Sequence, residues 1–446
     1  MTVVGSPPSN LAPVPVHLGA RHRPDTTLTP YQRRLWASQR RAPDSPLQNM
    51  ALVSHLAAAA DDPIDAARLR DAFAAVVARR DALRTRIDTS SASGEPRAVV
   101  MDEGPPSEIL PMRRDEVATW AHARASRPVD ASVCGYDSVI LTHDDGSASW
   151  YLCIHHVITD ATSSAMVFAE TAALYAGRSP TEPAASFVAW AGALRAADAR
   201  QQAAADHWAA WSAPEPIGGW YRTVTRATAA NERLRVDLDT DLRTAVDAAL
   251  AGQYRLLSPD MSWATLLVTI TAAHLARISG RDHVTIGLPI HNRNAAARDL
   301  VGLVMEVFPL TVEVRGTDTF AELHRRTARA VMELMRFAAP STSPAVEVDA
   351  VVNVIPRGSL GHFGSIPAQT SWVHAGAADP SHMVRVQLTT YEGDVPEIDL
   401  DVNRAGADDG QRAAALSHWR SLLAAAVRTP ETFVGDVQLL DRKSVV

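Results

Sequence analysis

A short segment in the first half of the chain places the strongest local constraint on the fold. Apolar residues run directly into two adjacent histidines, His155 and His156, and Asp160 follows after three more residues. The apolar run predicts a strand over residues 150–156. Successive side chains of a strand point to opposite faces, so the two histidines cannot both face one cavity. One of them is expected to be a packed support, and the other is free to act as a base.

A helix is predicted directly after the histidines. Residues 164–176 have an amphipathic pattern, and Thr162 and Ser163 are suitable N-cap residues. Histidine titrates near neutral pH, so one at this turn can accept a proton from an alcohol, an amine or a thiol. Asp160 is too close in sequence to orient that base. We expect it to hold the turn, ideally against an arginine from elsewhere in the chain.

The spacing of these residues resembles the His-His-x-x-x-Asp motif of the condensation-domain and chloramphenicol-acetyltransferase-like superfamily. His155, His156 and Asp160 match the motif, and Ala161 stands where the family has glycine. The resemblance implies that these three matching residues form the catalytic site. His156 would deprotonate or position the acceptor, and His155 would support it. Ala161 and Glu306 would lie along the substrate tunnel, although Glu306 could equally point away from it.

Other segments resemble motifs of the same family, in the same order along the chain. They are residues 28–36, 79–87, 186–190, 281–293 and 301–310. In the family, an arginine at the end of the fourth segment pairs with the aspartate of the histidine motif, which implies a pair of Arg293 with Asp160. A buried carboxylate is costly to desolvate unless it is paired, and an arginine can bind both of its oxygens in a bidentate fork. We therefore expect Arg293 to support the site.

The resemblance also predicts the architecture. It implies an α/β protein with two chloramphenicol-acetyltransferase-like lobes in a V-shaped pseudo-dimer, with a tunnel between the lobes. The sequence pattern breaks at a stretch rich in Gly and Pro, at residues 177–183. We therefore predict a flexible arm over residues 1–24, an N-terminal lobe with the histidine motif over 25–178, and a C-terminal lobe over 179–446.

Within the predicted C-terminal lobe, three elements have clear signals. Residues 262–279 are strongly apolar and predict a helix, and Gly280 is its expected C-cap. Residues 384–391 and 397–403 predict a pair of strands.

Composition excludes several classes of function. A net charge of −7 without a concentrated basic run gives no support for nucleic-acid binding. The two cysteines, Cys134 and Cys153, predict free thiols in a reducing cytosol rather than a disulfide framework. No spacing typical of a zinc site occurs, and we expect no metal. The N-terminus lacks the features of a signal peptide, and no apolar run approaches the roughly 20 residues that span a membrane. We therefore expect a cytoplasmic protein.

The function implied by the resemblance is acyl transfer. A peptidyl or acyl carrier protein would present the donor as a phosphopantetheine thioester, and a small-molecule alcohol or amine would accept it, without a permanently bound cofactor. A free-standing enzyme is expected, and the ester product is slightly favoured. One alternative is a lipid O-acyltransferase with an acyl-CoA or polyketide donor, which would need a wide apolar tunnel. A second alternative is a non-catalytic recruitment domain, which usually has a degraded histidine motif.

Overall fold

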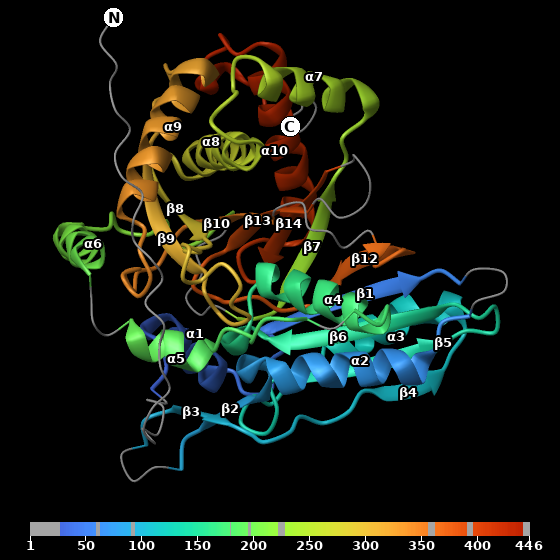
Figure 1. Cartoon of the computed structure of the whole chain (residues 1–446). Coiled ribbons are helices and arrows are strands. Elements are labelled where there is room, and N and C mark those ends of the chain that lie inside the picture. Colours follow the sequence, from blue (N-terminus) through green and yellow to red (C-terminus); the bar gives the residue numbers. More distant parts are fainter. Residues whose placement is uncertain are drawn as a thin grey trace, which may run out of the picture.

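A computed structural model describes residues 27–58, 63–90, 94–178, 180–194, 198–221, 228–355, 362–389 and 396–439. The arm predicted for residues 1–24 lies outside these ranges. The described chain contains two six-stranded sheets, each packed against its own helices (Figure 1). The predicted α/β class with two lobes is therefore confirmed.

The N-terminal lobe is a sheet covered by helices on both faces. Its strands, in spatial order, are β11 (His362–Phe363), β12 (Ile366–Val373), β1 (Asn49–Leu56), β6 (Ala148–His155), β5 (Tyr136–Thr142) and β4 (Glu108–Pro111). The helices are α2 (Ala66–Arg79), α3 (Val117–Ala125) and α4 (Ala161–Tyr175). Side chains alternate along β6, so that Leu152 and Ile154 pack with α2 and α4 while Tyr151 and Cys153 pack with α3.

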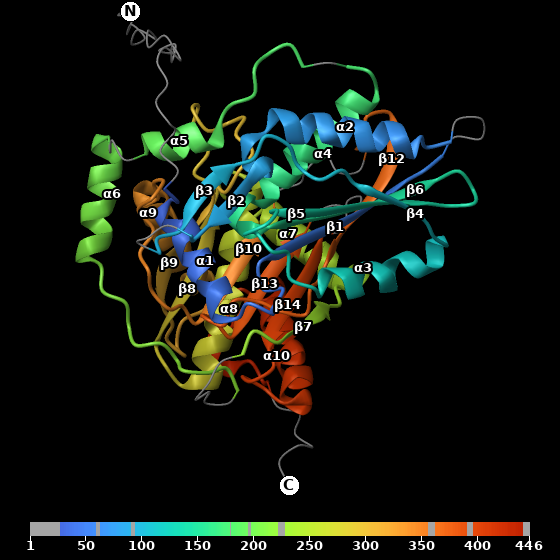
Figure 2. The ribbon, with the colours of Figure 1, turned by 90° about the horizontal axis from the view of Figure 1, so that it is seen from below.

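One strand of the N-terminal sheet comes from the second half of the chain. Strand β12 pairs antiparallel with β1, with Leu52 opposite Trp372. It therefore brings residues of the C-terminal half next to the strand that precedes β6 in the sheet (Figure 2). This pairing ties the two lobes together, and it places β12 close to the histidine turn.

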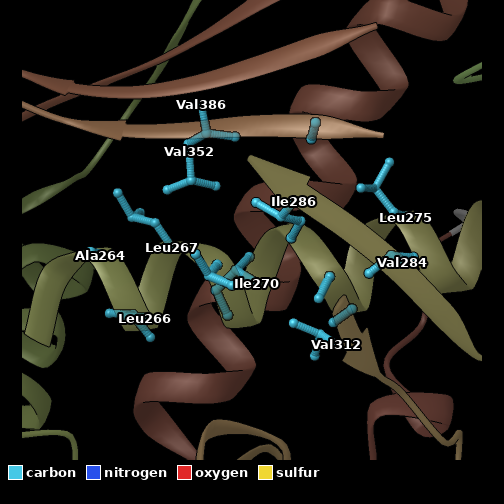
Figure 3. Close-up of a cluster of buried hydrophobic side chains, with 14 of the residues drawn as sticks. Ala264, Leu266, Leu267, Ile270, Leu275, Val284, Ile286, Val312, Val352 and Val386 are labelled. Carbon is cyan, nitrogen blue, oxygen red and sulfur yellow. The ribbon is translucent and has the colours of Figure 1, made fainter. Parts of the chain in front are cut away.

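The C-terminal lobe has its core on one face of its sheet. Its strands, in spatial order, are β7 (Asn231–Val236), β14 (Glu397–Asn403), β13 (Val384–Thr389), β10 (Ala350–Val354), β8 (His283–Ile290) and β9 (Glu306–Glu313). The helices are α7 (Thr240–Ala251), α8 (Pro259–Ser279), α9 (Phe320–Phe337) and α10 (Asp409–Arg428). Figure 3 shows aliphatic side chains of α8, such as Leu267 and Ile270, against Ile286 and Val352 of the sheet.

Helix α8 is the central element of this core. It is long and apolar enough to cross a membrane, contrary to the expectation that no apolar run has that length, but most of it is buried inside the protein. Ser258 caps its first turn, Pro259 occupies the first helical position, and Gly280 ends it with a positive φ of 72°, as predicted. The burial of α8 against the sheet and against α9 and α10 accounts for its apolar sequence.

The opposite face of the C-terminal sheet is polar. In β13 and β14, apolar residues alternate with charged or amide residues, so Val386 and Leu400 enter the core while Arg385, Gln387 and Asp401 lie on the other face. The helices lie on one side of this sheet in Figure 1, and the N-terminal lobe lies on the other. The polar face is therefore turned toward the region between the two lobes.

Short elements complete the fold. They are α1 (Pro30–Arg41), β2 (Thr85–Asp88), β3 (Arg97–Val100), α5 (Phe187–Ala193) and α6 (Ala199–Ala210). Helix α1 starts with a capping box between Thr29 and Gln32, and the Gln32 amide also donates to the Val157 carbonyl at 2.8 Å. The start of α1 is thereby fixed to the histidine turn. Cys134 and Cys153 are both free thiols, as predicted.

Candidate active site

His156 opens the turn that follows strand β6. The strand ends at His155, one residue before the predicted end, and a single 3₁₀ turn covers His156–Ile158. The His156 ring Nδ1 lies 2.8 Å from the carbonyl oxygen of Thr159. A carbonyl can only accept, so Nδ1 must carry the hydrogen, and Nε2 of the neutral ring keeps its lone pair. Nε2 is therefore the atom of His156 that can accept a proton.

His155 has a different environment. Its side chain is fully buried, its Nδ1 accepts the backbone N–H of Val157 at 3.1 Å, and its ring packs near the ring of Trp36. It lines neither of the two cavities described below. Burial lowers the pKa of His155 to about 3, with a smaller contribution from the neighbouring His156. This geometry indicates that His155 is the packed residue that supports the turn.

Asp160 is the N-cap of helix α4. The helix begins at Ala161, three residues earlier than predicted, because the Asp160 carboxylate accepts the backbone N–H of Ser163 at 2.7 Å. Aspartate is as good an N-cap as serine or threonine, so the prediction of Thr162 or Ser163 as the cap was wrong. The Asp160 side chain also accepts the N–H groups of Val304 and Met305 at 3.0 and 3.2 Å.

Arg293 lies against the Asp160 carboxylate, the partner expected for it. Its Nη2 is 2.8 and 3.0 Å from the two carboxylate oxygens, whereas its Nη1 donates to the carbonyls of Ala297 and Leu300. A single nitrogen therefore serves both oxygens, and the expected bidentate fork is absent from this pair. Burial by itself raises the pKa of Asp160, but the Arg293 charge and the N–H donors of Ser163 and Val304 outweigh it, and the net pKa is lowered.

Ser163 links this ion pair to the next loop. Its hydroxyl accepts from Arg293 Nη2 at 2.8 Å and from the Gly302 N–H at 3.0 Å, and it donates to the Gly302 carbonyl at 2.7 Å. A Cβ on Gly302 would lie 2.1 Å from the nearest ring atom of Phe187. The close approach of the Gly302 backbone to the Phe187 ring therefore requires glycine at this position.

Gly302→Ala is expected to lower the free energy of unfolding by about 1–3 kcal/mol, because the added methyl group must displace a packed aromatic ring. Urea denaturation measures the change. Gly410→Ala is the matched control, since a Cβ there would have its nearest contact at 3.6 Å. Equal stability of the Gly302→Ala variant and the wild type would contradict this packing.

His156 is uncharged at neutral pH. Burial lowers its pKa below the ordinary value of 6.5, against the hydrogen bond to Thr159 and the charge of Asp160, which both raise it. A lowered pKa means that the ring gains its proton only in more acidic solution. A neutral imidazole with a free Nε2 is the form that a general base requires.

Long-range ¹H–¹⁵N NMR of the histidine rings is expected to show His156 as the Nδ1–H tautomer at pH 7, with a pKa below 6.5. Comparison with the spectrum of His156→Ala assigns the signal. An Nε2–H tautomer, or a charged ring at pH 7, would contradict the geometry.

Two cavities meet at His156. Their volumes are about 470 and 110 Å³, and both are lined by His156, Met305, Asn353 and Arg385. The larger extends along α1, and the smaller extends between β1, β12 and the polar face of the C-terminal sheet. Both cavities are lined by residues of the two lobes. The arrangement can hold two separate molecules, with His156 within reach of each.

Ala161 and Glu306 lie in different surroundings. Ala161 lines the smaller cavity, and its first-turn helical position requires no positive φ, so alanine fits where the family has glycine. Glu306 lines neither cavity. Its carboxylate accepts the backbone N–H groups of Ser341 and Ser343 at 2.5 and 3.2 Å, and burial raises its pKa to about 7. At this place the cavity wall is formed by its neighbour, Met305.

Sequence reasoning missed the charged residues of the cavity wall. Arg233 of β7 and Arg385 of β13 both line the smaller cavity, and both bind the buried Asp401 of β14. The signal was present, because charged and amide residues alternate with apolar ones in both predicted strands of the pair at 384–391 and 397–403. Such alternation indicates a sheet with one polar face.

Comparisons with known proteins agree with this geometry. The family model named Condensation domain matches residues 23–339. Isonitrile lipopeptide synthase from Streptomyces coeruleorubidus is 25% identical over 437 residues, which cover 91% of this chain and 29% of that protein. A dimodular nonribosomal peptide synthase from Bacillus subtilis is 23% identical over 343 residues, which cover 70% of this chain and 14% of that protein. The chain therefore spans less than a third of the length of these relatives.

Solved structures show the same fold. The first condensation domain of the CDA synthetase superposes with a TM-score of 0.77 and 21% identity, covering 94% of this chain and 99% of that chain. The condensation domain from the monacolin K polyketide synthase MokA has a TM-score of 0.77 and 18% identity, covering 92% and 98%. The chain belongs to the condensation-domain family, whose members are acyltransferases that form amide or ester bonds.

Proposed function

We propose that this protein transfers an acyl or aminoacyl group from a carrier-protein phosphopantetheine thioester to a small-molecule alcohol or amine, in natural-product biosynthesis. The observation that carries the proposal is that His156, whose Nδ1 carries the hydrogen and whose Nε2 keeps its lone pair, lines both cavities. One cavity would receive the donor thioester and the other the acceptor. His155 and the pair of Asp160 with Arg293 would hold the turn that presents His156.

The chemistry needs only one base. In the proposed step, His156 Nε2 takes the proton of the acceptor hydroxyl or amine while the acceptor oxygen or nitrogen forms a bond to the thioester carbonyl carbon. The carbon–sulfur bond then breaks, and the leaving thiolate takes a proton from the imidazolium. The ring returns to its neutral form, and no acyl-enzyme is formed. Positioning of both substrates supplies a further part of the rate, since oriented intramolecular reactions reach effective molarities of roughly 10⁵–10⁸ M.

The charges of the smaller cavity favour a polar substrate over a long alkyl chain. Arg233 and Arg385 line this cavity, whereas the wall of the larger one has both apolar and charged residues. Burial of an alkyl chain against charged groups would desolvate them without compensation. The smaller cavity therefore argues against a lipid O-acyltransferase whose alkyl chain occupies it. The ordered, uncharged His156 argues against a purely recruiting role. Function in the cytoplasm is part of this proposal, which the free thiols of Cys134 and Cys153 support.

Intact-mass spectrometry of loaded carrier proteins tests the proposal. Carriers that hold different aminoacyl groups are incubated with the enzyme and a small library of alcohols and amines. The expected result is loss of the acyl group from the carrier together with a new ester or amide, and neither occurs with His156→Ala. Reaction of acyl-CoA donors alone would overturn the carrier-dependent reading in favour of the lipid type. Binding of a carrier without any transfer would overturn catalysis in favour of recruitment.

A further inference from the structure

The charges that line the smaller cavity have a single sign. Arg233 and Arg385 are the charged side chains of its wall, and the described lining residues include no carboxylate. The histidines of the wall add no charge at neutral pH, since burial lowers the pKa of His374 to about 4 and also lowers the pKa of His156 and His291. The cavity therefore presents two guanidinium groups to whatever occupies it.

The carboxylate that both arginines bind lies beneath the cavity wall. Asp401 is fully buried between their strands, directly opposite Arg385 on β13 and Arg233 on β7. Burial raises its pKa, but the charges of the two arginines outweigh this effect, so Asp401 is an anion at neutral pH. Two cations and one anion form a row across three strands, and Asp399 of the adjacent row lies 3.7 Å from Arg233 Nε.

Each arginine binds Asp401 through only two of its three guanidinium nitrogens. Arg233 donates from Nε and Nη2 at 2.7 and 2.9 Å, and Arg385 donates from Nε and Nη2 at 3.1 and 2.6 Å. Within the described part of the chain, the Nη1 group of neither arginine has a hydrogen-bond partner, and the two side chains are 18% and 28% exposed. Four N–H donors on Nη1 groups are therefore available at this wall.

The next row of the same sheet provides a contrast. Arg235 binds Asp399 at 2.5 Å and Glu397 at 2.6 Å, and it lines neither cavity. Of these three arginines, Arg233 and Arg385 line the cavity next to His156, and Arg235 does not. Structural pairing of the strands does not require the second arginine, because Arg233 alone satisfies both oxygens of Asp401.

We propose that a substrate of this protein carries a carboxylate close to its reacting group, and that Arg385 and Arg233 bind this carboxylate through their Nη1 groups. The inference rests on the proposed function, because it takes the occupant of the cavity to be a condensation substrate. Guanidinium groups match a carboxylate in geometry and in charge. The phosphate of a pantetheine arm is a poorer match, since the length of the arm separates it from the thioester, whereas Arg385 and His156 line the same two cavities.

The carboxylate could belong to the acceptor or to the donor, and matched probes distinguish the two. For the acceptor, L-phenyllactate is compared with L-phenyllactamide, and L-phenylalanine with L-phenylalaninamide. For the donor, a carrier-bound succinyl group is compared with a butyryl group of equal chain length. In one of these two comparisons, the kcat/KM of the wild type is expected to be about 10- to 100-fold higher for the probe with the carboxylate. Charge-assisted hydrogen bonds contribute a difference of this size. Arg385→Gln is expected to abolish that preference.

Two variants control for folding. Arg235→Gln makes the same change in the adjacent row and is expected to leave the preference intact. Arg385→Lys keeps a cation beside Asp401 but has no second donor arm, so it should fold like the wild type while most of the preference is lost. Equal kcat/KM for the probes with and without a carboxylate, in both the acceptor and the donor comparison, would overturn the inference. So would an Arg385→Gln variant that slows with acid and amide by the same factor, because the preference would then survive and Arg385 would act on the reaction rather than on a carboxylate.

A binding measurement separates this inference from the proposed function. Saturation-transfer NMR with His156→Ala compares the acid and amide probes without any turnover. Binding of the acids that depends on Arg385, in a protein that transfers no acyl group from any donor, would support the carboxylate site and refute the condensation reaction. Acyl transfer without any preference for a carboxylate would support the condensation reaction and refute the carboxylate site.

Discussion

Replacement of His156 by alanine is expected to lower kcat by about 10²–10⁴-fold. The Nδ1–H bond to the Thr159 carbonyl leaves Nε2 with its lone pair, and both cavities are open to this residue. Among the described residues that line both cavities, His156 is the one histidine, and alanine removes its imidazole. The variant should still bind a loaded carrier, because the other residues of the cavity walls are unchanged. Steady-state condensation assays at saturating donor measure kcat of the variant and of the wild type.

His283→Ala is the matched control for this variant. His283 is an exposed histidine at the start of β8, and it lines neither cavity. Its replacement is expected to leave kcat unchanged. If His156→Ala turned over as fast as His283→Ala, the role of His156 as a base would be wrong.

Arg293→Ala is expected to lower the free energy of unfolding by about 3–5 kcal/mol. Arg293 and Asp160 are 10% and 1% exposed, so the variant leaves a carboxylate buried without its cation. The N–H donors of Ser163, Val304 and Met305 remain, but they compensate only in part. Urea denaturation and the melting temperature measure the loss. Arg315→Ala breaks an exposed ion pair with Glu313 and should change stability by less than about 1 kcal/mol.

The contribution of this pair also depends on pH. The folded-state pKa of Asp160 is lower than its unfolded value of about 3.9, so the stabilisation is fully present above that value and is lost as the pH falls through the folded-state pKa. Arg293→Ala should therefore differ most from the wild type at neutral pH. A difference in melting temperature that grew in acid, or that was absent at pH 7, would exclude the ion pair as its cause.

The parts of the site that were predicted correctly have local signals or family spacing. The adjacent histidines at a strand end follow from the sequence near them, whereas the pairing of Arg293 with Asp160 follows from the family resemblance. The helix cap was misjudged because Asp160, Thr162 and Ser163 are all good caps. The carboxylate of Asp160 caps the helix, and the hydroxyl of Ser163 instead binds Gly302, which is distant in the sequence.

The parts that were missed depend on contacts between distant segments. Strand β12 has no turn signal that ties it to β1, yet it joins the N-terminal sheet more than 300 residues later in the chain. The wall formed by Arg233 and Arg385 requires three strands from both ends of the C-terminal lobe to meet at Asp401. Glu306 has a carboxylate in the expected region, but the backbone of residues 341–343 binds it, and no sequence pattern indicated that contact.

The pH dependence of a single turnover tests the central claim most directly, namely that neutral His156 Nε2 accepts the proton of the acceptor. A loaded carrier is mixed with excess enzyme and acceptor, and the rate of acyl transfer is measured from pH 5 to pH 8. The wild-type rate is predicted to be constant near neutrality and to fall with one protonation below pH 6.5, where His156 becomes charged. His156→Ala is predicted to be slow at every pH and to lack that protonation. The same rate and the same profile in both proteins would contradict the account.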